Sequence, residues 1–108
     1  MNRRGPYVCG VEAAMDVFAG KWKSTILWEL HDHGTRRFGE LRRALDGVSE
    51  KMLAQHLREM EEDGLIVRRD HGVVPPRVDY SLTEHGRTLN EALHELTRWG
   101  EERMQRLG

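Results

Sequence analysis

The spacing of the apolar residues changes at Gly64, and this change constrains the fold more than any other feature of the chain. Before Gly64, apolar residues recur every three or four positions, which is the period of an amphipathic α-helix. The two short runs that follow, 65–69 and 78–82, are rich in β-branched and aromatic residues and have the period of a β-strand. The helical period then returns and continues to about residue 106. The sequence therefore predicts a mainly helical chain with one small β-hairpin.

Glycines and helix-capping residues divide the helical parts. Gly34 and Gly64 stand where periodic segments stop, as glycines do at helix C-termini. Ser49 is a good N-cap for the helix that follows a tight turn, and Thr83 is a good N-cap for the last helix. The expected helices are 10–19, 21–33, 38–45, 50–63 and 84–106.

This order of elements is that of a winged helix-turn-helix domain. A three-helix unit followed by a β-hairpin is the winged-helix arrangement, and 108 residues suit one domain. We expect a single domain over residues 1–108, with the helix-turn-helix at about 38–63 and the wing at about 65–82. The first and last helices, about 10–19 and 84–106, are then additions for dimerisation.

The charges are distributed unevenly along the chain. The formal net charge is −1, which by itself argues against a nucleic-acid-binding protein. Between Gly34 and Arg58, however, six basic residues oppose three acidic ones. A near-neutral protein with one basic face can still hold phosphates, so the charge distribution allows a DNA-binding role.

Several classes of protein are not expected from this sequence. No apolar run is long enough to cross a membrane and no secretory signal is recognisable, so a cytoplasmic location is expected. The chain contains no nucleophile motif and no phosphate-binding glycine loop, so it is not expected to be an enzyme. Its six histidines are scattered and form no ligand set, so neither a metal site nor a cofactor is expected.

The predicted helix 50–63 has two different faces. Its apolar stripe must face the core and consists of Leu53, Leu57 and Met60. Lys51, Gln55 and Arg58 form a stripe on the opposite side. Glutamine can pair with adenine, and lysine or arginine with guanine or phosphate, so we predict that this stripe, with Ser49 at the N-cap, reads DNA. The alternative is a solvated helix face, but the turn before the helix and the hairpin after it favour DNA reading.

Arginines outside this helix are candidates for contacts with the DNA backbone. They lie around the predicted third helix and in the hairpin: Arg36, Arg37, Arg42, Arg43, Arg69 and Arg77. The loop at Pro75-Pro76 would place Arg77 at the backbone or in a minor groove. The alternatives are that some of these arginines pair with Glu40 or Asp46, and that the hairpin is an ordinary charged one.

The last predicted helix carries an apolar stripe that is too long for one small domain to cover. We expect this stripe to form a homodimer together with the first helix. The expected interface residues are Val11, Met15, Phe18, Leu89, Leu93, Leu96 and Trp99. A twofold dimer predicts a pseudo-palindromic operator with half-sites about 34 Å apart, or a multiple of that distance. The alternative is that the helix folds back on its own domain.

The same segments resemble the HxlR-type family of bacterial winged-helix regulators. The similarity runs from Cys9 over nearly the whole chain, and its most specific parts are the segment 74–83 and Trp99-Gly100. Other matching stretches are 20–22, 37–41, 48–53, 57–61 and 64–66. The resemblance implies a dimer joined by its first and last helices and a fourth helix in the major groove. It also implies control of nearby genes, often in response to electrophiles or oxidants.

Cys9 is the one cysteine of the sequence, so it cannot form a disulfide within the chain. It lies just before the first predicted helix, where the helix dipole favours a thiolate. One interpretation is a sensor that is oxidised or alkylated, with a disulfide across the dimer as one route. The other is a small packed residue without a redox role.

A different class of function stays open beside DNA binding. Winged helices can bind partner proteins through the same faces, and the net negative charge motivates this alternative. The sequence thus predicts a sequence-specific, dimeric DNA-binding transcriptional regulator, with a protein-interaction module as the alternative. It names no small-molecule inducer.

Overall fold

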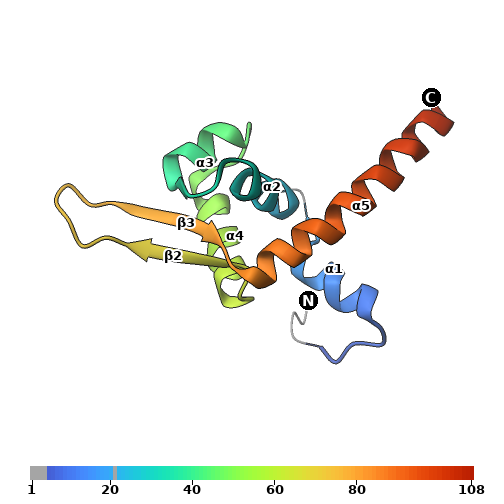
Figure 1. Ribbon diagram of the computed structural model, residues 1–108, viewed down its shortest axis with the longest axis horizontal. Coiled ribbons are helices and arrows are strands. Elements are labelled where there is room, and N and C mark those ends of the chain that lie inside the picture. The colour runs from blue at the N-terminus through green and yellow to red at the C-terminus, as the bar shows by residue number, and fades with distance from the viewer. Residues whose placement is uncertain (1–4, 21) are drawn as a thin grey trace.

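The computed structural model describes residues 5–20 and 22–108. The chain forms a winged helix-turn-helix domain in which helices surround one end of a small sheet (Figure 1). The elements are α1 (Gly10–Phe18), α2 (Lys23–His33), β1 (Arg36–Arg37), α3 (Phe38–Ala44), α4 (Glu50–Glu62), β2 (Ile66–Asp70), β3 (Val78–Leu82) and α5 (Glu84–Leu107). The predicted mainly helical fold with a small β-hairpin is therefore confirmed.

The sheet contains one strand that the sequence did not predict. β1 pairs antiparallel with β3, with Arg36 opposite Tyr80 and Arg37 opposite Asp79, so the strand order is β1-β3-β2. Two residues are too few to show a period, and the partner strand is distant in the sequence. Lys21, where the second helix was expected to begin, lies outside the described residues, and α2 begins at Lys23.

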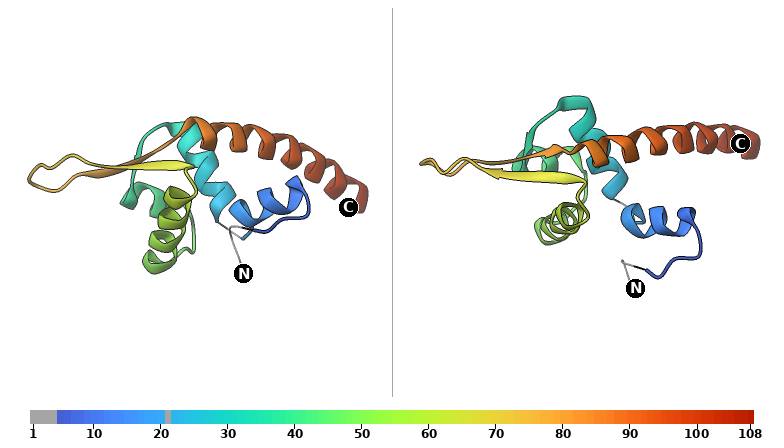
Figure 2. Two further views of the ribbon diagram at one scale, coloured as in Figure 1. Left: turned by 90° about the horizontal axis from the view of Figure 1, so that it is seen from below. Right: turned by 60° about the horizontal axis from the view of Figure 1, so that its bottom comes forward.

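The hairpin of β2 and β3 is the wing. Its register runs from Ile66 opposite Leu82 to Asp70 opposite Val78. The wing and α5 extend from the helical body in opposite directions, and α1 lies beside α5 (Figure 2). The wing tip and the far half of α5 therefore reach out on either side of the domain.

The core lies between α2, α3, α4 and the base of the wing. Its fully buried side chains are Ile26, Leu27, Leu41, Leu45, Leu53, Leu57, Met60 and Leu65. Burying one such side chain contributes about 1.5–3 kcal/mol, so this cluster supplies most of the driving force for folding. It also holds α4 by one face and leaves the opposite face in solvent.

The wing and α5 are joined at a short junction. Thr83 is the N-cap of α5: its hydroxyl accepts a hydrogen bond from the Gly86 amide at 3.0 Å and donates one to the Gly64 carbonyl at 2.6 Å. The Thr83 amide donates to the Leu65 carbonyl at 3.0 Å. Gly86 is buried, and a Cβ atom there would collide with the carbonyl oxygen of Leu65. The start of α5 therefore packs closely on the start of the wing.

Within the described residues, none of the helices combines the length and the apolar character that a membrane span requires.

Candidate nucleic-acid interface

α4 presents the predicted polar stripe to solvent. Ser49 caps the helix, since its hydroxyl accepts a hydrogen bond from the Met52 amide at 3.0 Å. Lys51, Gln55 and Arg58 are exposed. The apolar stripe, Leu53, Leu57 and Met60, is buried on the opposite side. A helix with this division can enter a groove of DNA without losing any contact to its own core.

A buried ion pair fixes α4 against α2. Nζ of Lys23 lies 2.7 Å from Oε1 of Glu59, and the Lys23 side chain is only 6% exposed. His56 lies next to this pair, with Nδ1 3.9 Å from the same carboxylate oxygen. Burial, and then the positive charge of Lys23, lowers the pKa of His56. This cluster could not be predicted from the sequence, because Lys23 is far from His56 and Glu59 in the chain.

Arginines from β1, from α3 and from the wing meet at one hollow of about 570 Å³. We call it the basic hollow. The arginines that line it are Arg36, Arg37, Arg43 and Arg77. The carboxylates of Glu40 and Asp79 line it as well, so the positive charges outnumber the negative ones. The structure thus brings together four of the six arginines predicted to contact the backbone.

Two of the predicted arginines donate hydrogen bonds to carboxylates. Arg36 donates to Glu40 at 3.2 Å, lies 3.9 Å from Glu29 and is 24% exposed. Arg42 donates to Glu50 at 2.8 Å. A hydrogen bond from the Arg37 amide, assisted by the charge of Arg36, lowers the pKa of Glu40. Arg36 therefore pairs with Glu40, as one alternative from the sequence had it. Arg42 pairs with Glu50, which the sequence did not suggest as a partner.

A buried carboxylate lies at the base of the wing. Asp79 is 6% exposed, and its Oδ2 lies 2.7 Å from Nε2 of His71 and 3.8 Å from Nε of Arg77. Arg37 on β1 and Arg69 on β2 are directly opposite Asp79 in the sheet. Directly opposite residues share a face, so Asp79 lies among cations of both β1 and the wing. No local pattern in the sequence indicates this role of Asp79, because its partners come from other parts of the sheet.

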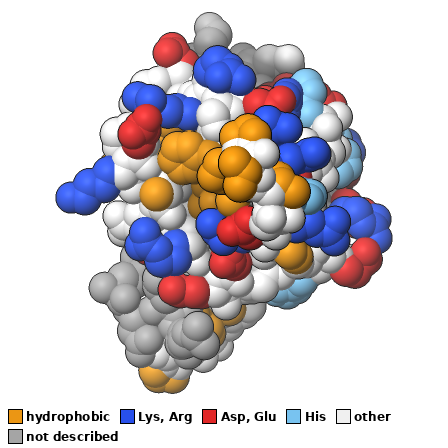
Figure 3. Space-filling model, turned by 90° about the vertical axis from the view of Figure 1, so that its left-hand side faces the viewer, with side chains coloured by type: hydrophobic (Ala, Val, Ile, Leu, Met, Phe, Trp, Pro, Cys, Tyr) orange, Lys and Arg blue, Asp and Glu red, His pale blue; other side chains and the backbone are white. Residues whose placement is uncertain are grey.

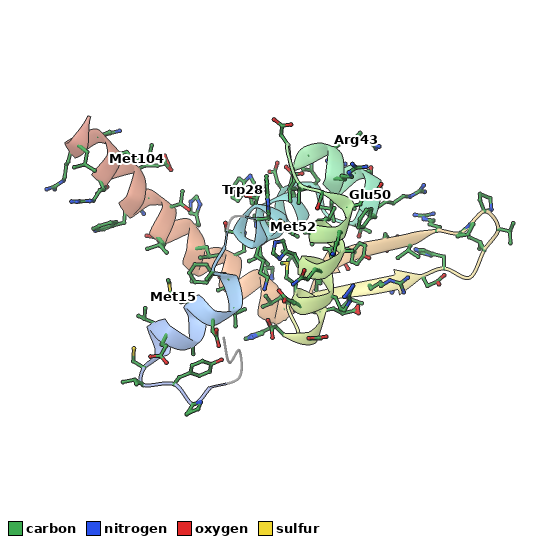
Figure 4. The ribbon with its side chains drawn as sticks, turned by 180° about the vertical axis from the view of Figure 1, so that it is seen from behind. Met15, Trp28, Arg43, Glu50, Met52 and Met104 are labelled. Carbon is green, nitrogen blue, oxygen red and sulfur yellow. The ribbon has the colours of Figure 1, made fainter. Side chains whose placement is uncertain are left out.

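The wing ends in an apolar tip. Val73 is 50% exposed and Val74 96% exposed, and Pro75 and Pro76 beside them are exposed too. In the view onto the wing end of the molecule, hydrophobic side chains lie at the centre and Lys and Arg side chains lie on several sides of them (Figure 3). This end of the protein therefore combines an apolar projection with surrounding positive charge. Arg43 and Glu50 mark the neighbouring end of the helical body (Figure 4).

The predicted dimer residues fall into two groups. Leu89 and Leu93 are half-buried and pack against the core of their own domain. For this part of α5, the alternative that the helix folds back on its own domain is therefore correct. Phe18 is half-buried. The exposed group consists of Val11, Met15, Leu96 and Trp99. The unpartnered apolar face of α5 therefore begins at Leu96 and continues to Leu107, which is 71% exposed.

Cys9 is exposed and occupies the N-cap position of α1, where its side chain makes no capping hydrogen bond. Among the residues that the structure describes, no three His, Cys, Asp or Glu side chains group closely enough to hold a metal ion.

Known proteins with the same pattern identify the family. The family model described as HxlR-like helix-turn-helix matches residues 17–107. The regulatory protein MalR of Fusobacterium mortiferum is 46% identical over 102 residues, covering 94% of this chain and 96% of MalR.

Two solved structures are also similar. The redox regulator HypR in its reduced form has a TM-score of 0.84 at 41% identity, covering 92% of this chain and 97% of HypR. The reduced form of the transcriptional regulator YodB from B. subtilis has a TM-score of 0.78 at 31% identity, covering 89% of this chain and 94% of YodB. Family, sequence and fold agree, and the chain therefore belongs to the HxlR-like helix-turn-helix family of transcriptional regulators.

Proposed function

We propose that this regulator binds a specific duplex DNA sequence as a homodimer, with α4 in the major groove and the wing along the adjacent backbone. The exposed stripe of Lys51, Gln55 and Arg58 carries the proposal, because the core holds the other face of the same helix. Glutamine can bond to adenine in two places, and arginine or lysine to guanine. Ser49 caps the end of α4 that carries Lys51 and Gln55, which is the end where recognition helices meet base edges, and Arg58 follows one turn later.

The basic hollow is the proposed grip on the phosphate backbone. Arg37, Arg43 and Arg77 line it and are exposed, so they can reach a phosphate without leaving a buried position. Arg69, exposed on β2, extends this surface along the wing. Arg36 and Arg42 contribute less, because each is already bonded to a carboxylate.

The proposed dimer uses α1 and the far half of α5. Leu96, Trp99 and Leu107 are exposed on α5, and Val11 and Met15 on α1. An exposed apolar stripe of this length supports contact with a second copy, because it would otherwise lie in water. Twofold symmetry then gives a pseudo-palindromic operator.

Cys9 is the proposed point at which an oxidant acts. It is exposed at the start of α1, which belongs to the proposed dimer surface. Because the chain has one cysteine, two-electron oxidation can join the Cys9 thiols of two copies in a disulfide while the oxidant takes up both electrons and the two protons leave. HypR, a redox regulator of the same fold, supports this assignment.

The test is fluorescence anisotropy with a duplex that the wild-type protein selects from a random pool, measured over a salt series. Gln55→Ala and Arg58→Ala are each expected to weaken binding about tenfold or more, since a bidentate base contact contributes about 1–3 kcal/mol. The matched control is Arg98→Ala on α5, which also removes an exposed arginine and is expected to leave binding unchanged.

Each part of the proposal has its own contrary result. Binding that does not depend on salt would contradict phosphate contacts and favour a protein-interaction module. If the wild type and both α4 variants bound the duplex with equal affinity, α4 would not be the helix that contacts the bases. A Cys9→Ser protein that still releases DNA on treatment with an oxidant would exclude Cys9 as the sensor.

A further inference from the structure

A groove of about 390 Å³ lies between α2 and α5, away from α4 and the wing. This volume falls within the range of small-molecule sites, roughly 300–1,000 Å³. Trp28 on α2 lies in it where α2 and α5 meet (Figure 4). We propose that this groove binds an uncharged, planar aromatic molecule that carries an amide or similar hydrogen-bonding group.

Asn90 supplies the polar contact of the groove. Its side chain lines the groove and is only 5% exposed, yet within residues 5–20 and 22–108 its amide makes no hydrogen bond. An amide that is largely removed from water and has no protein partner gains free energy from a hydrogen bond with a ligand. The amide offers both a donor and an acceptor, so it fits a ligand group that offers both in return.

Trp28 and His94 supply an aromatic wall. The two rings are stacked, with centroids 6.2 Å apart and planes that differ by 6°, and Trp28 also stacks on His31, with centroids 5.9 Å apart. Trp28 remains 46% exposed, which leaves part of its surface free to contact a ligand. An aromatic ring is the ligand shape that such a wall contacts over the largest area. Leu93, also in the lining, adds apolar surface.

The charges in the groove favour a neutral ligand over an anion. Among the described residues, the lining contains neither lysine nor arginine, and Glu101 is a carboxylate at an exposed position. An anion would lose its hydration without gaining a cation, and it would meet the Glu101 charge. The buried polar group that faces the ligand, Asn90, is itself uncharged.

The groove also lies on a different face of α5 from the proposed dimer surface. At 100° per residue, Asn90, Thr97 and Glu101 lie about 100–140° around the helix from Leu96 and about 160–180° from Trp99. A ligand can therefore occupy the groove while the face of α5 that carries Leu96 and Trp99 contacts a second copy. A bound molecule would connect α2, which supports α4, with α5, so it would influence DNA binding. That last consequence alone rests on the proposed function.

The experiment uses the full chain labelled with 5-fluorotryptophan, which gives three fluorine signals, for Trp22, Trp28 and Trp99. Single Trp→Phe variants assign them. The probes are benzamide, benzoate and benzamidine, which share a ring and differ in charge. Benzamide is expected to move the Trp28 signal saturably and to leave the Trp99 signal in place. Benzoate is expected to bind at least ~10-fold more weakly, because its charge is not compensated.

Two variants test the assigned residues. Asn90→Leu is expected to weaken benzamide binding about 3- to 10-fold, the effect of one lost hydrogen bond, while Glu95→Gln on the opposite face of α5 leaves it unchanged. Trp28→Leu, at an exposed position, tests the aromatic wall and is read from binding competition by fluorine-labelled benzamide. Urea unfolding shows that each variant is folded.

Three results would overturn the proposal. These are equal movement of all three tryptophan signals, benzamide affinity that survives Asn90→Leu, and benzamidine binding more tightly than benzamide. A Trp28 signal that moves with protein concentration in the absence of any probe would show that a second copy covers the groove, and it would also overturn the proposal. No DNA is present in these measurements, so their failure is separate from failure of the proposed function.

Discussion

Nζ of Lys23 on α2 lies 2.7 Å from Oε1 of Glu59 on α4, and the lysine side chain is almost completely buried. This pair connects the helix at the centre of the core with the helix that carries the exposed polar stripe. A buried charge needs its partner, because it has lost its hydration. The pair therefore fixes the position of α4 in a way that apolar contacts alone do not.

Lys23→Met is expected to lower the free energy of unfolding by about 2 kcal/mol, because Glu59 loses its Lys23 partner while remaining partly buried. Urea unfolding measures this. The double variant Lys23→Met/Glu59→Gln is expected to recover part of the loss, since no carboxylate is then left without the lysine. If the losses of unfolding free energy in the single variants Lys23→Met and Glu59→Gln added up to the loss in the double variant, the two residues would not be coupled.

The stability of the protein is expected to fall in mild acid because of His56. Burial, and then the charge of Lys23, lowers the pKa of His56 below its ordinary value of 6.5. The unfolded chain then binds the proton more tightly than the folded chain. Stability is complete above about pH 6.5 and decreases as the pH falls from there towards the folded pKa.

Urea midpoints between about pH 8 and about pH 5 test this dependence, and His56→Gln is expected to flatten it. The matched control is His85→Gln, since His85 is exposed on α5. A profile that is flattened equally by both changes would assign the dependence to other groups.

Gly86→Ala is expected to destabilise the domain by about 1–3 kcal/mol or more, because the new methyl group collides with the backbone carbonyl of Leu65. Gly100→Ala, in the same helix, is the matched control. A Cβ there has nothing within 4 Å, so this change is expected to stabilise the helix by up to ~1 kcal/mol. Thermal unfolding should show opposite shifts, and shifts of the same sign would contradict the close packing at Gly86.

Asp79→Asn is expected to destabilise the base of the wing by about 1–2 kcal/mol, since His71 loses a charged acceptor and the surrounding arginines lose the carboxylate. Asp70→Asn is the control, because Asp70 is exposed and its side chain accepts a hydrogen bond from the Gly72 amide. Hydrogen exchange of the β2 and β3 amides measures the local effect. Equal protection in both variants would show that Asp79 does not hold the wing.

The sequence predicted those features that depend on local period. The burial of Leu53 and Leu57 and the exposure of Lys51 and Gln55 follow from the geometry of one helix, and the structure agrees. The cap by Ser49 is local as well. These predictions needed no knowledge of what the helix packs against.

Features that depend on distant partners could not be predicted in this way. β1 exists because Arg36 and Arg37 meet β3, and Lys23 is buried because Glu59 comes from another helix. Periodicity likewise extended one apolar stripe along α5, although Leu93 belongs to the domain core and Leu96 does not. The pattern shows that a face is apolar, but it does not show what covers that face.

The junction at Thr83 has a mechanical consequence. The Thr83 side chain forms hydrogen bonds both to Gly64, just before the wing, and to Gly86 in the first turn of α5. The wing and α5 are therefore connected at one point, about which α5 can tilt. With 24 residues, α5 is about 36 Å long, so a tilt of roughly 10° at this pivot moves its far end by about 6 Å. A displacement of that size exceeds the rise of one base pair. Small adjustments at Thr83 and Gly86 are thereby amplified into the distance between the two halves of any assembly built on α5.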